Sequence, residues 1–329
     1  MSTGRKLLFS LLSLVLFVVG AEAALRAMGW PKIDDGAEFA HRQVYWVSDP
    51  NLRDEPMLHK ELGVSFPVST DKNGLRAPIH DEQKPPGVLR VMTLGCSTTF
   101  GWGVADAESY PARLEALLHE AGYSNVEVIN GGQPGYTSFQ GRWLWDTVLN
   151  RYDPDVVLLG YIVQDARKAA YSDLSQAILM REGAFFKANV LYNWRLYLAM
   201  KVATGAVVVR AKEREEGGDA GVFRVSEQEY LDNLRDLRAK ITAKGAKVVH
   251  FGFPLEVVGY TETHRRLLRL EAESAGIPWF DPSEEVEREA AKRTLFFPQD
   301  RGHPNADGTA LIAQLVRDYL VREELVGGK

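Results

Sequence analysis

The chain of 329 residues has a single cysteine, Cys96, so no disulfide bond can form within it. It also lacks a basic surplus: 39 Lys and Arg residues stand against 44 Asp and Glu residues, and the net charge of −5 argues against a nucleic-acid-binding surface. No His-Glu-x-x-His motif, paired cysteines, dinucleotide fingerprint or P-loop is found in the sequence. We therefore predict a protein that needs no metal or cofactor and binds no nucleic acid.

The N-terminus has the pattern of a membrane-targeting segment. Arg5 and Lys6 precede an uncharged apolar stretch over residues 7–21. Ala21-Glu22-Ala23 resembles a cleavage site, but the helical pattern continues through residue 28, as in an uncleaved anchor. Residues 1–28 are thus a signal peptide or a signal-anchor helix, and both alternatives place the bulk of the chain outside the cytoplasm.

The remaining sequence divides into an N-terminal segment without sustained periodicity, residues 29–86, and a regular domain, residues 87–329. In the domain, apolar runs alternate with amphipathic stretches, which predicts βαβ units, a mostly parallel sheet and helices on both of its faces. The predicted strands cover residues 88–94, 126–130, 155–163, 246–254 and 277–282. The predicted helices cover residues 109–122, 137–152, 226–245, 262–276 and 305–325.

Residues 166–225 interrupt this alternation with helical patterns and a charged stretch over 210–221. Their position after the third strand puts them at the carboxyl edge of the sheet, where such folds bind ligands. This insertion is a lid, a membrane-facing patch or a partner surface, or else a helical excursion that only packs on the domain.

The first strand of the domain leads into GCSTTFG, which exposes the hydroxyl of Ser97 just beyond the strand end. A serine nucleophile needs a histidine base that a carboxylate orients. Asp300 and His303 have the spacing for this pair, and their loop precedes the last helix. The alternative for this loop is a helix cap with a chance histidine. The other histidines, at positions 41, 59, 80, 119, 250 and 264, are interpreted as surface or core residues.

Two further loops supply hydrogen-bond donors at the same edge. NGGQPGYTS, residues 130–138, offers backbone N–H groups, and Gln164 in YIVQD offers a side-chain amide. Such donors can stabilise the negative charge that develops on a carbonyl oxygen during acyl transfer. Cys96 is an alternative nucleophile, although its side chain should point away from that of Ser97.

The set GCSTTFG, NGGQPGYTS, YIVQD and DRGHPN resembles the SGNH/GDSL hydrolases, in family order. The resemblance implies a flavodoxin-like αβα sandwich with Ser97 as nucleophile and Asp300 and His303 as its partners. It also implies an oxyanion hole from Ser97, Gly135 and Gln164. Three positions depart from the family pattern: Cys96 replaces Asp, Ile162 replaces Gly and Gln164 replaces Asn.

Together these features predict an extracytoplasmic serine esterase that acts on acylated glycans, lipids or small esters. One alternative is an O-acyltransferase that passes the acyl group to a polysaccharide. The other is an inactive binding module with the same fold, which the departures at Ile162 and Gln164 suggest. If residues 1–28 stay attached, the membrane is a partner as well.

Overall fold

The computed structural model describes residues 2–30, 45–60, 62–169, 171–181, 194–200, 202–204, 221–256 and 259–327. It has two compact units, of which one comprises Met1–Trp46 and Lys168–Val222 and the other Val47–Arg167 and Phe223–Lys329. Residues 205–220, which include all but the last residue of the charged stretch predicted over 210–221, lie outside the described residues, as do residues 31–44 of the N-terminal segment.

The larger unit is built on a five-stranded sheet with the order β4-β3-β5-β8-β9, and every pair of neighbours is parallel. The strands are β3 (Leu89–Gly95), β4 (Val126–Gly132), β5 (Val156–Leu159), β8 (Lys247–Phe251) and β9 (Trp279–Phe280). The central strands are buried on both faces, as their continuous apolar runs require. The predicted α/β fold with a mostly parallel sheet is confirmed.

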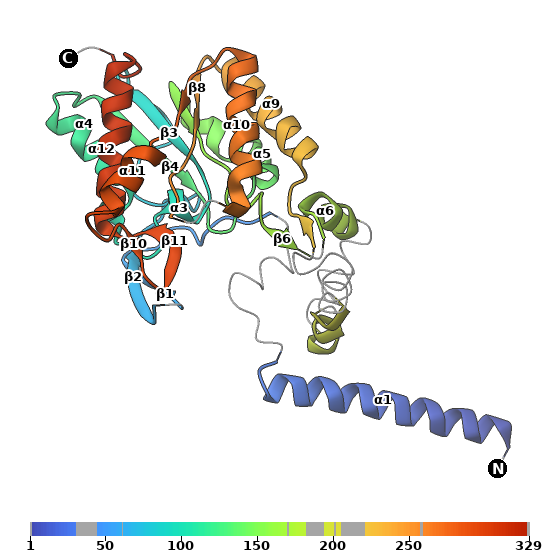
Figure 1. Ribbon diagram of the computed structural model, residues 1–329. Helices are drawn as coiled ribbons and strands as arrows, with labels where there is room; N and C mark the ends of the chain where they lie inside the picture. The colour runs from blue at the N-terminus through green and yellow to red at the C-terminus, as the bar shows by residue number, and fades with distance from the viewer. Residues whose placement is uncertain are drawn as a thin grey trace. The chain divides into compact units, whose positions relative to one another are not determined.

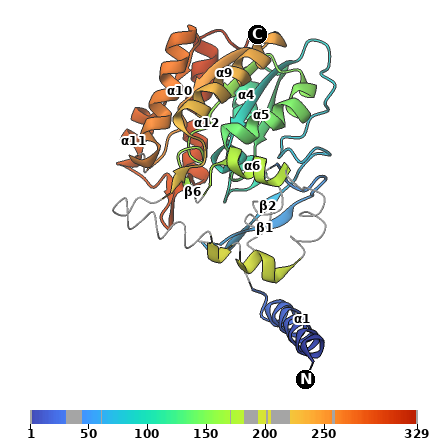
Figure 2. The ribbon, with the colours of Figure 1, turned by 90° about the vertical axis from the view of Figure 1, so that its right-hand side faces the viewer.

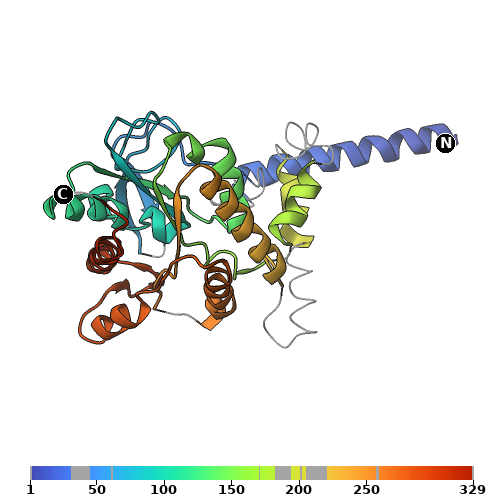
Figure 3. The ribbon, with the colours of Figure 1, turned by 90° about the horizontal axis from the view of Figure 1, so that it is seen from above.

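Helices cover both faces of this sheet (Figures 1 and 3). On one face α4 (Tyr110–Glu120) packs on α12 (Ala306–Arg322), which also contacts α11 (Ser283–Ala290). On the other face, which Figure 2 turns toward the viewer, α9 packs between α5 and α10. The bounds on this face are α5 (Ser138–Thr147), α9 (Glu227–Ala243) and α10 (Glu262–Ala275). The short 3-10 helices are η1 (Asp106–Glu108), η2 (Leu149–Tyr152) and η4 (Gly259–Thr261).

Several elements differ from the expected ones, including the following three. The helix expected over 137–152 ends at Thr147 and continues as η2, because Val148 leaves helical geometry with φ −128° and ψ −63°. The strand expected over 155–163 ends at Leu159, and residues 163–166 form a turn. Within 29–86, where no regular element is expected, β1 (Glu55–His59) and β2 (Val64–Val68) form an antiparallel hairpin.

Arg76 joins this N-terminal segment to the first loop of the sheet. Its guanidinium is completely buried and donates to Asp106 Oδ1 at 2.7 Å. It also donates to the carbonyl oxygens of Phe100 at 3.0 Å and Val104 at 2.6 Å, and to that of Gly101. A buried cation is stable only where it is paired and its donors are satisfied. The loop that follows Ser97 is therefore held around Arg76.

The smaller unit contains α1 (Thr3–Ala27), α6 (Asp173–Arg181) and the two-stranded pairing of β6 (Lys168–Ala169) with β7 (Val222–Phe223) at its border. Among the described residues, α1 is the one helix long and apolar enough to cross a membrane. Glu22 of α1 accepts hydrogen bonds from the backbone N–H groups of Arg195 at 3.1 Å and Leu196 at 2.8 Å. These two donors lie in the first turn of helical residues 195–200, so that Glu22 caps this helix.

We expect Arg76→Ala to lower the free energy of unfolding by about 3–5 kcal/mol, because it leaves Asp106 and several buried carbonyl groups without their donor. Urea denaturation measures the change. Arg235→Ala is the matched control, since Arg235 forms an exposed pair with Asp232 at 3.4 Å, and it should change stability by less than about 0.5 kcal/mol. Equal losses in the two variants would contradict the role assigned to Arg76.

Candidate active site

Ser97 is the first residue of a short helix, α3 (Ser97–Phe100), that begins directly after β3. The helix ends at Gly101, whose φ of +89° is left-handed and suits glycine. A second glycine lets α3 lie against β4: a Cβ on Gly132 would come within 2.3 Å of the backbone nitrogen of Phe100. The turn therefore holds Ser97 at the carboxyl end of the sheet through contacts of the backbone itself.

Ser97 and His303 meet across the fold, although they are far apart in the sequence. The Nε2 atom of His303 lies 2.8 Å from the hydroxyl oxygen of Ser97. On the other side of the ring, Nδ1 is hydrogen-bonded to Asp300 Oδ2. Asp300 and His303 both belong to β11 (Asp300–Pro304). This strand pairs with β10 (Phe296–Phe297) and contacts α3 (Figure 1). This is the geometry in which a histidine can take a proton from a serine hydroxyl.

The loop that carries Asp300 and His303 does not use either residue to cap the last helix. Asn305 is the N-cap of α12, and its side-chain oxygen accepts a hydrogen bond from the N–H of Gly308 at 3.0 Å. Asp300 accepts a further bond from the N–H of Gly302 at 3.3 Å. The capping function expected as the alternative is thus carried by a neighbouring residue.

Asp300 is kept in its ionised form. Partial burial acts to raise its pKa, but the hydrogen bond and charge of His303, the N–H of Gly302 and the charge of His59 together lower the pKa below its usual value. An ionised Asp300 fixes the proton of His303 on Nδ1 and leaves Nε2 as the acceptor that faces Ser97.

His59 is a member of this cluster that the sequence did not indicate. It lies at the end of β1, is completely buried, and places Nε2 at 3.1 Å from Asp300 Oδ2. Its ring packs edge-on against Phe297 and His303, with centroid distances of 5.5 and 6.1 Å. The interpretation of His59 as a plain surface or core histidine was incomplete, because only the tertiary fold brings β1 to Asp300.

His59, Asp300 and His303 each offer one ligand atom, and these atoms lie within 4.8 Å of one another. Such a set could hold a metal ion. However, His303 and Asp300 already share a hydrogen bond across the same space, so a metal would replace the contact that orients the imidazole. The same arrangement also has the geometry for proton transfer from Ser97 to His303.

The loops after β4 and β5 bring Gly135 and Gln164 to the same edge as Ser97. Gly135 has a φ of +78°, a conformation that glycine adopts without strain. Its carbonyl oxygen accepts a hydrogen bond from Arg224 Nη1 at 2.8 Å, and the same nitrogen donates to Gln164 Oε1 at 3.1 Å. Arg224 is a second residue that the sequence analysis missed, since a single arginine after a long insertion gives no signal.

The loop after β5 is also hydrogen-bonded to the start of α5. Asp165 Oδ1 accepts from the backbone N–H of Ser138 at 2.8 Å and from its hydroxyl, at the start of α5. Ile162, at the position where the family resemblance leads us to expect glycine, is buried. The segment that carries Gln164 is therefore anchored on both sides of that residue.

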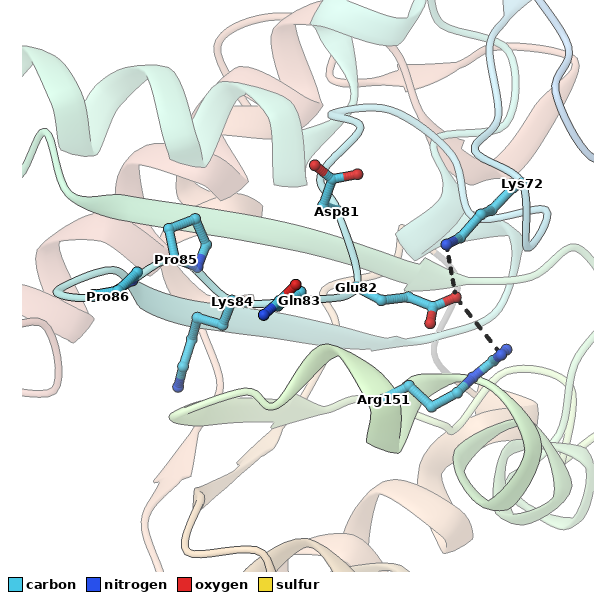
Figure 4. Close-up of a pocket in the computed structure, with 8 residues that line it drawn as sticks. All are labelled: Lys72, Asp81, Glu82, Gln83, Lys84, Pro85, Pro86 and Arg151. Atoms are coloured by element: carbon cyan, nitrogen blue, oxygen red, sulfur yellow. Dashed lines mark ion pairs between the residues drawn. The ribbon is translucent and has the colours of Figure 1, made fainter.

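A cavity of about 750 Å³ lies away from these residues, among Lys72, Asp81, Glu82, Gln83, Lys84, Pro85, Pro86 and Arg151 (Figure 4). Its proline-containing segment leads into the amino end of β3, whereas Ser97 follows the carboxyl end. Its cations are neutralised locally: Lys72 and Arg151 pair with Glu82 at 3.4 and 3.6 Å, and Lys84 with Asp155 at 2.9 Å. The lining contains no serine, cysteine or histidine.

Residues 93–311 match the model of the GDSL-like lipase/acylhydrolase family. A solved lipase/acylhydrolase from Enterococcus faecalis is 14% identical, with a TM-score of 0.49 over 72% of this chain and 97% of its own. A psychrotrophic esterase from a Pseudoalteromonas species is 16% identical, with a TM-score of 0.47 over 72% and 99%. A Geobacillus acetyl-xylooligosaccharide esterase is 16% identical, with a TM-score of 0.47 over 75% and 98%. No curated protein matches the chain.

We expect a fluorophosphonate probe, which reacts with activated serine hydroxyls, to label the wild type and to leave Ser97→Ala unlabelled. Cys96→Ala is the matched control: the thiol is buried in the hydrophobic core, so that labelling should persist. In-gel fluorescence after equal incubation measures both. Loss of labelling in Cys96→Ala alone would assign the nucleophile to the thiol instead.

Proposed function

Because the chain belongs to the GDSL-like lipase/acylhydrolase family and is thus an ester-bond hydrolase, we propose that Ser97, His303 and Asp300 form its catalytic triad. The observation that carries this proposal is the 2.8 Å contact between Ser97 Oγ and His303 Nε2, with Asp300 bonded to the far side of the ring. We infer an extracytoplasmic serine esterase that works through an acyl-enzyme.

In the first half of the reaction, His303 Nε2 takes the proton of the Ser97 hydroxyl while Oγ attacks the acyl carbon. The charge on the carbonyl oxygen is stabilised by N–H donors of Ser97, Gly135 and Gln164. As the tetrahedral intermediate collapses, the imidazolium gives its proton to the leaving alkoxide, and the alcohol departs. Asp300 remains ionised throughout and stabilises the positive charge of the ring.

In the second half, water replaces the alcohol. His303 accepts a proton from the water, whose oxygen attacks the acyl carbon of the ester on Ser97. Collapse of this second intermediate returns the proton from His303 to Ser97 Oγ and releases the carboxylic acid. The enzyme ends in its starting protonation state, and no cofactor is needed to balance the step.

The sequence shows no pattern that marks a long apolar tunnel for an acyl chain. We therefore propose short acyl groups on glycans or small esters in preference to long-chain lipids. An O-acyltransferase would use the same acyl-enzyme with a sugar hydroxyl in place of the water.

We expect the wild type to hydrolyse short-chain model esters faster than long-chain ones, and Ser97→Ala to show no turnover above background. The value of kcat/KM should fall on acidification, because protonated His303 cannot accept the serine proton. Since the pKa of Asp300 is lowered, its carboxylate stays charged there and continues to orient the imidazole. Initial rates measured against pH test this, and a kcat/KM that does not fall on acidification would contradict the assignment.

Acceptor dependence separates the two enzyme classes. Acid release that is unchanged by an added polysaccharide acceptor supports the esterase. Acyl groups that appear on the acceptor at the expense of acid release would instead identify a transferase. A wild type that neither reacts with the probe nor turns over any ester would overturn the enzymatic proposal.

We further propose that α1 is retained as a membrane anchor rather than removed. Glu22, which lies within the small-residue sequence at 21–23, caps helical residues 195–200. Cleavage after Ala23 would remove the Glu22 carboxylate and leave the backbone N–H groups of Arg195 and Leu196 without this acceptor.

The anchor has a direct test. In the native membrane, we expect the protein to migrate at its full 36.7 kDa and to resist extraction with alkaline carbonate. As a control, a variant with an optimised signal-peptidase site after Ala23 should give a shorter, extractable form. A shorter wild-type species in the soluble fraction would show that the helix is a cleaved signal peptide.

A further inference from the structure

Arg224 connects three segments that surround the proposed site. Its Nη1 atom donates to the carbonyl oxygen of Gly135 at 2.8 Å and to Gln164 Oε1 at 3.1 Å. Its Nη2 atom donates to Gln140 Oε1 at 3.1 Å, near the start of α5. One guanidinium thus binds the loop after β4, the loop after β5 and the helix that follows β4 in the chain.

We propose that Arg224 is a positioning residue that sets the orientation of the Gln164 amide for the oxyanion, an inference that rests on the proposed function. Arginine carries only N–H donors, so the group of Gln164 that faces it has to be the oxygen. The NH₂ group of the same amide then points away from Arg224 and is the part that can serve a different acceptor. Without Arg224, this contact would no longer determine which side the oxygen and which side the NH₂ group of Gln164 occupies.

The need for such a residue follows from the side chain at position 164. Glutamine has one more rotatable bond than the asparagine that the family resemblance leads us to expect there, so fixing its amide costs more conformational entropy. A catalytic donor works best when its direction is set before the reaction, because no reorganisation is then needed as charge develops. The bond from Arg224 restrains this extra freedom.

Arg224 is itself held in place from the backbone side. Its N–H donates to the carbonyl oxygen of Arg167 at 2.8 Å, and the N–H of the next residue, Val225, donates to Asp165 O at 3.3 Å. His264 Nε2 also lies 2.9 Å from the carbonyl oxygen of Val225. The strand of chain that carries Arg224 is therefore attached directly to the loop that carries Gln164, which makes the guanidinium a fixed reference for the amide.

The same nitrogen restrains Gly135. A glycine at positive φ has wide freedom of rotation, and the hydrogen bond from Arg224 to its carbonyl oxygen limits that freedom. Gln140 Oε1, the third acceptor, also accepts from the N–H of Thr137 at 3.1 Å in the cap of α5. The two loops that supply Gly135 and Gln164 consequently keep a fixed spacing.

A double-mutant cycle tests this role. We expect Gln164→Ala to lower kcat for a short-chain ester by about 10²–10³-fold, the cost of one lost oxyanion donor. Arg224→Ala should lower kcat by about 10²-fold, the cost of a misplaced group, with KM little changed because the contact acts in the transition state. Adding Arg224→Ala to Gln164→Ala should cost far less than the 10²-fold that it costs in the wild type, since Arg224 acts mainly through Gln164 and only in part through Gly135.

Two further variants separate positioning from mere structure. Gln164→Glu keeps an oxygen for Arg224 but removes the N–H donors, so its rate should be as low as that of Gln164→Ala at equal or higher thermal stability. Arg142→Ala is the control: Arg142 bridges α5 to α9 through Asp236 at 2.6 Å and Asn233 at 3.0 Å, and its loss should leave kcat unchanged. Should Arg224→Ala fail to fold, Arg224→Lys, which can serve one acceptor but not all three, takes its place in the cycle.

The outcomes are distinct. The positioning role would be overturned if the losses in kcat of Arg224→Ala and Gln164→Ala multiplied in the double variant. It would also be overturned if Gln164→Glu were as fast as the wild type. In both cases a Ser97-dependent esterase would remain. Full activity in Gln164→Ala would do the same. Absence of ester hydrolysis and probe labelling in the wild type would overturn the proposed function itself.

Discussion

Parallel pairing of β3 with β4 on one side and β5 on the other determines where the polar groups of the site lie. Gly95 is paired with Gly132 and Leu94 with Leu159, so the three strands end at nearly the same level. The residues that follow each end therefore leave the sheet at one edge. Because the strands are buried on both faces, the edge is where polar chemistry can reach substrate.

The N-terminal segment completes this edge from outside the part of the chain that the family model covers. That match begins at residue 93, yet His59 contacts Asp300 and Arg76 binds the carbonyl groups that follow Ser97. Both side chains are fully buried, and both come from a region that precedes the first strand of the sheet. The domain and the segment before it thus share one set of polar contacts around the proposed site.

The sequence predicts those features that depend on neighbours in the chain. The strands of the sheet can be predicted because each is a run of apolar residues, and the proximity of Asp300 to His303 follows from their spacing. His59 and Arg224 could not be foreseen in the same way. Each is a single polar residue in a stretch without periodicity, and its partner is fixed only when distant elements pack. The hairpin of β1 and β2 is not predicted for a related reason, because the exposed residues of its strands obscure the alternation of apolar and polar positions.

The close approach of α3 to β4 has a further consequence. Because a Cβ at position 132 would come within 2.3 Å of the Phe100 nitrogen and 2.7 Å of the Thr99 carbonyl carbon, main chain rests on main chain there. The height of the serine hydroxyl above the sheet is then independent of the size of surrounding side chains. Core residues beneath it can change in evolution while the Ser97 hydroxyl keeps its level, whereas a side chain at Gly132 would push α3 away from β4.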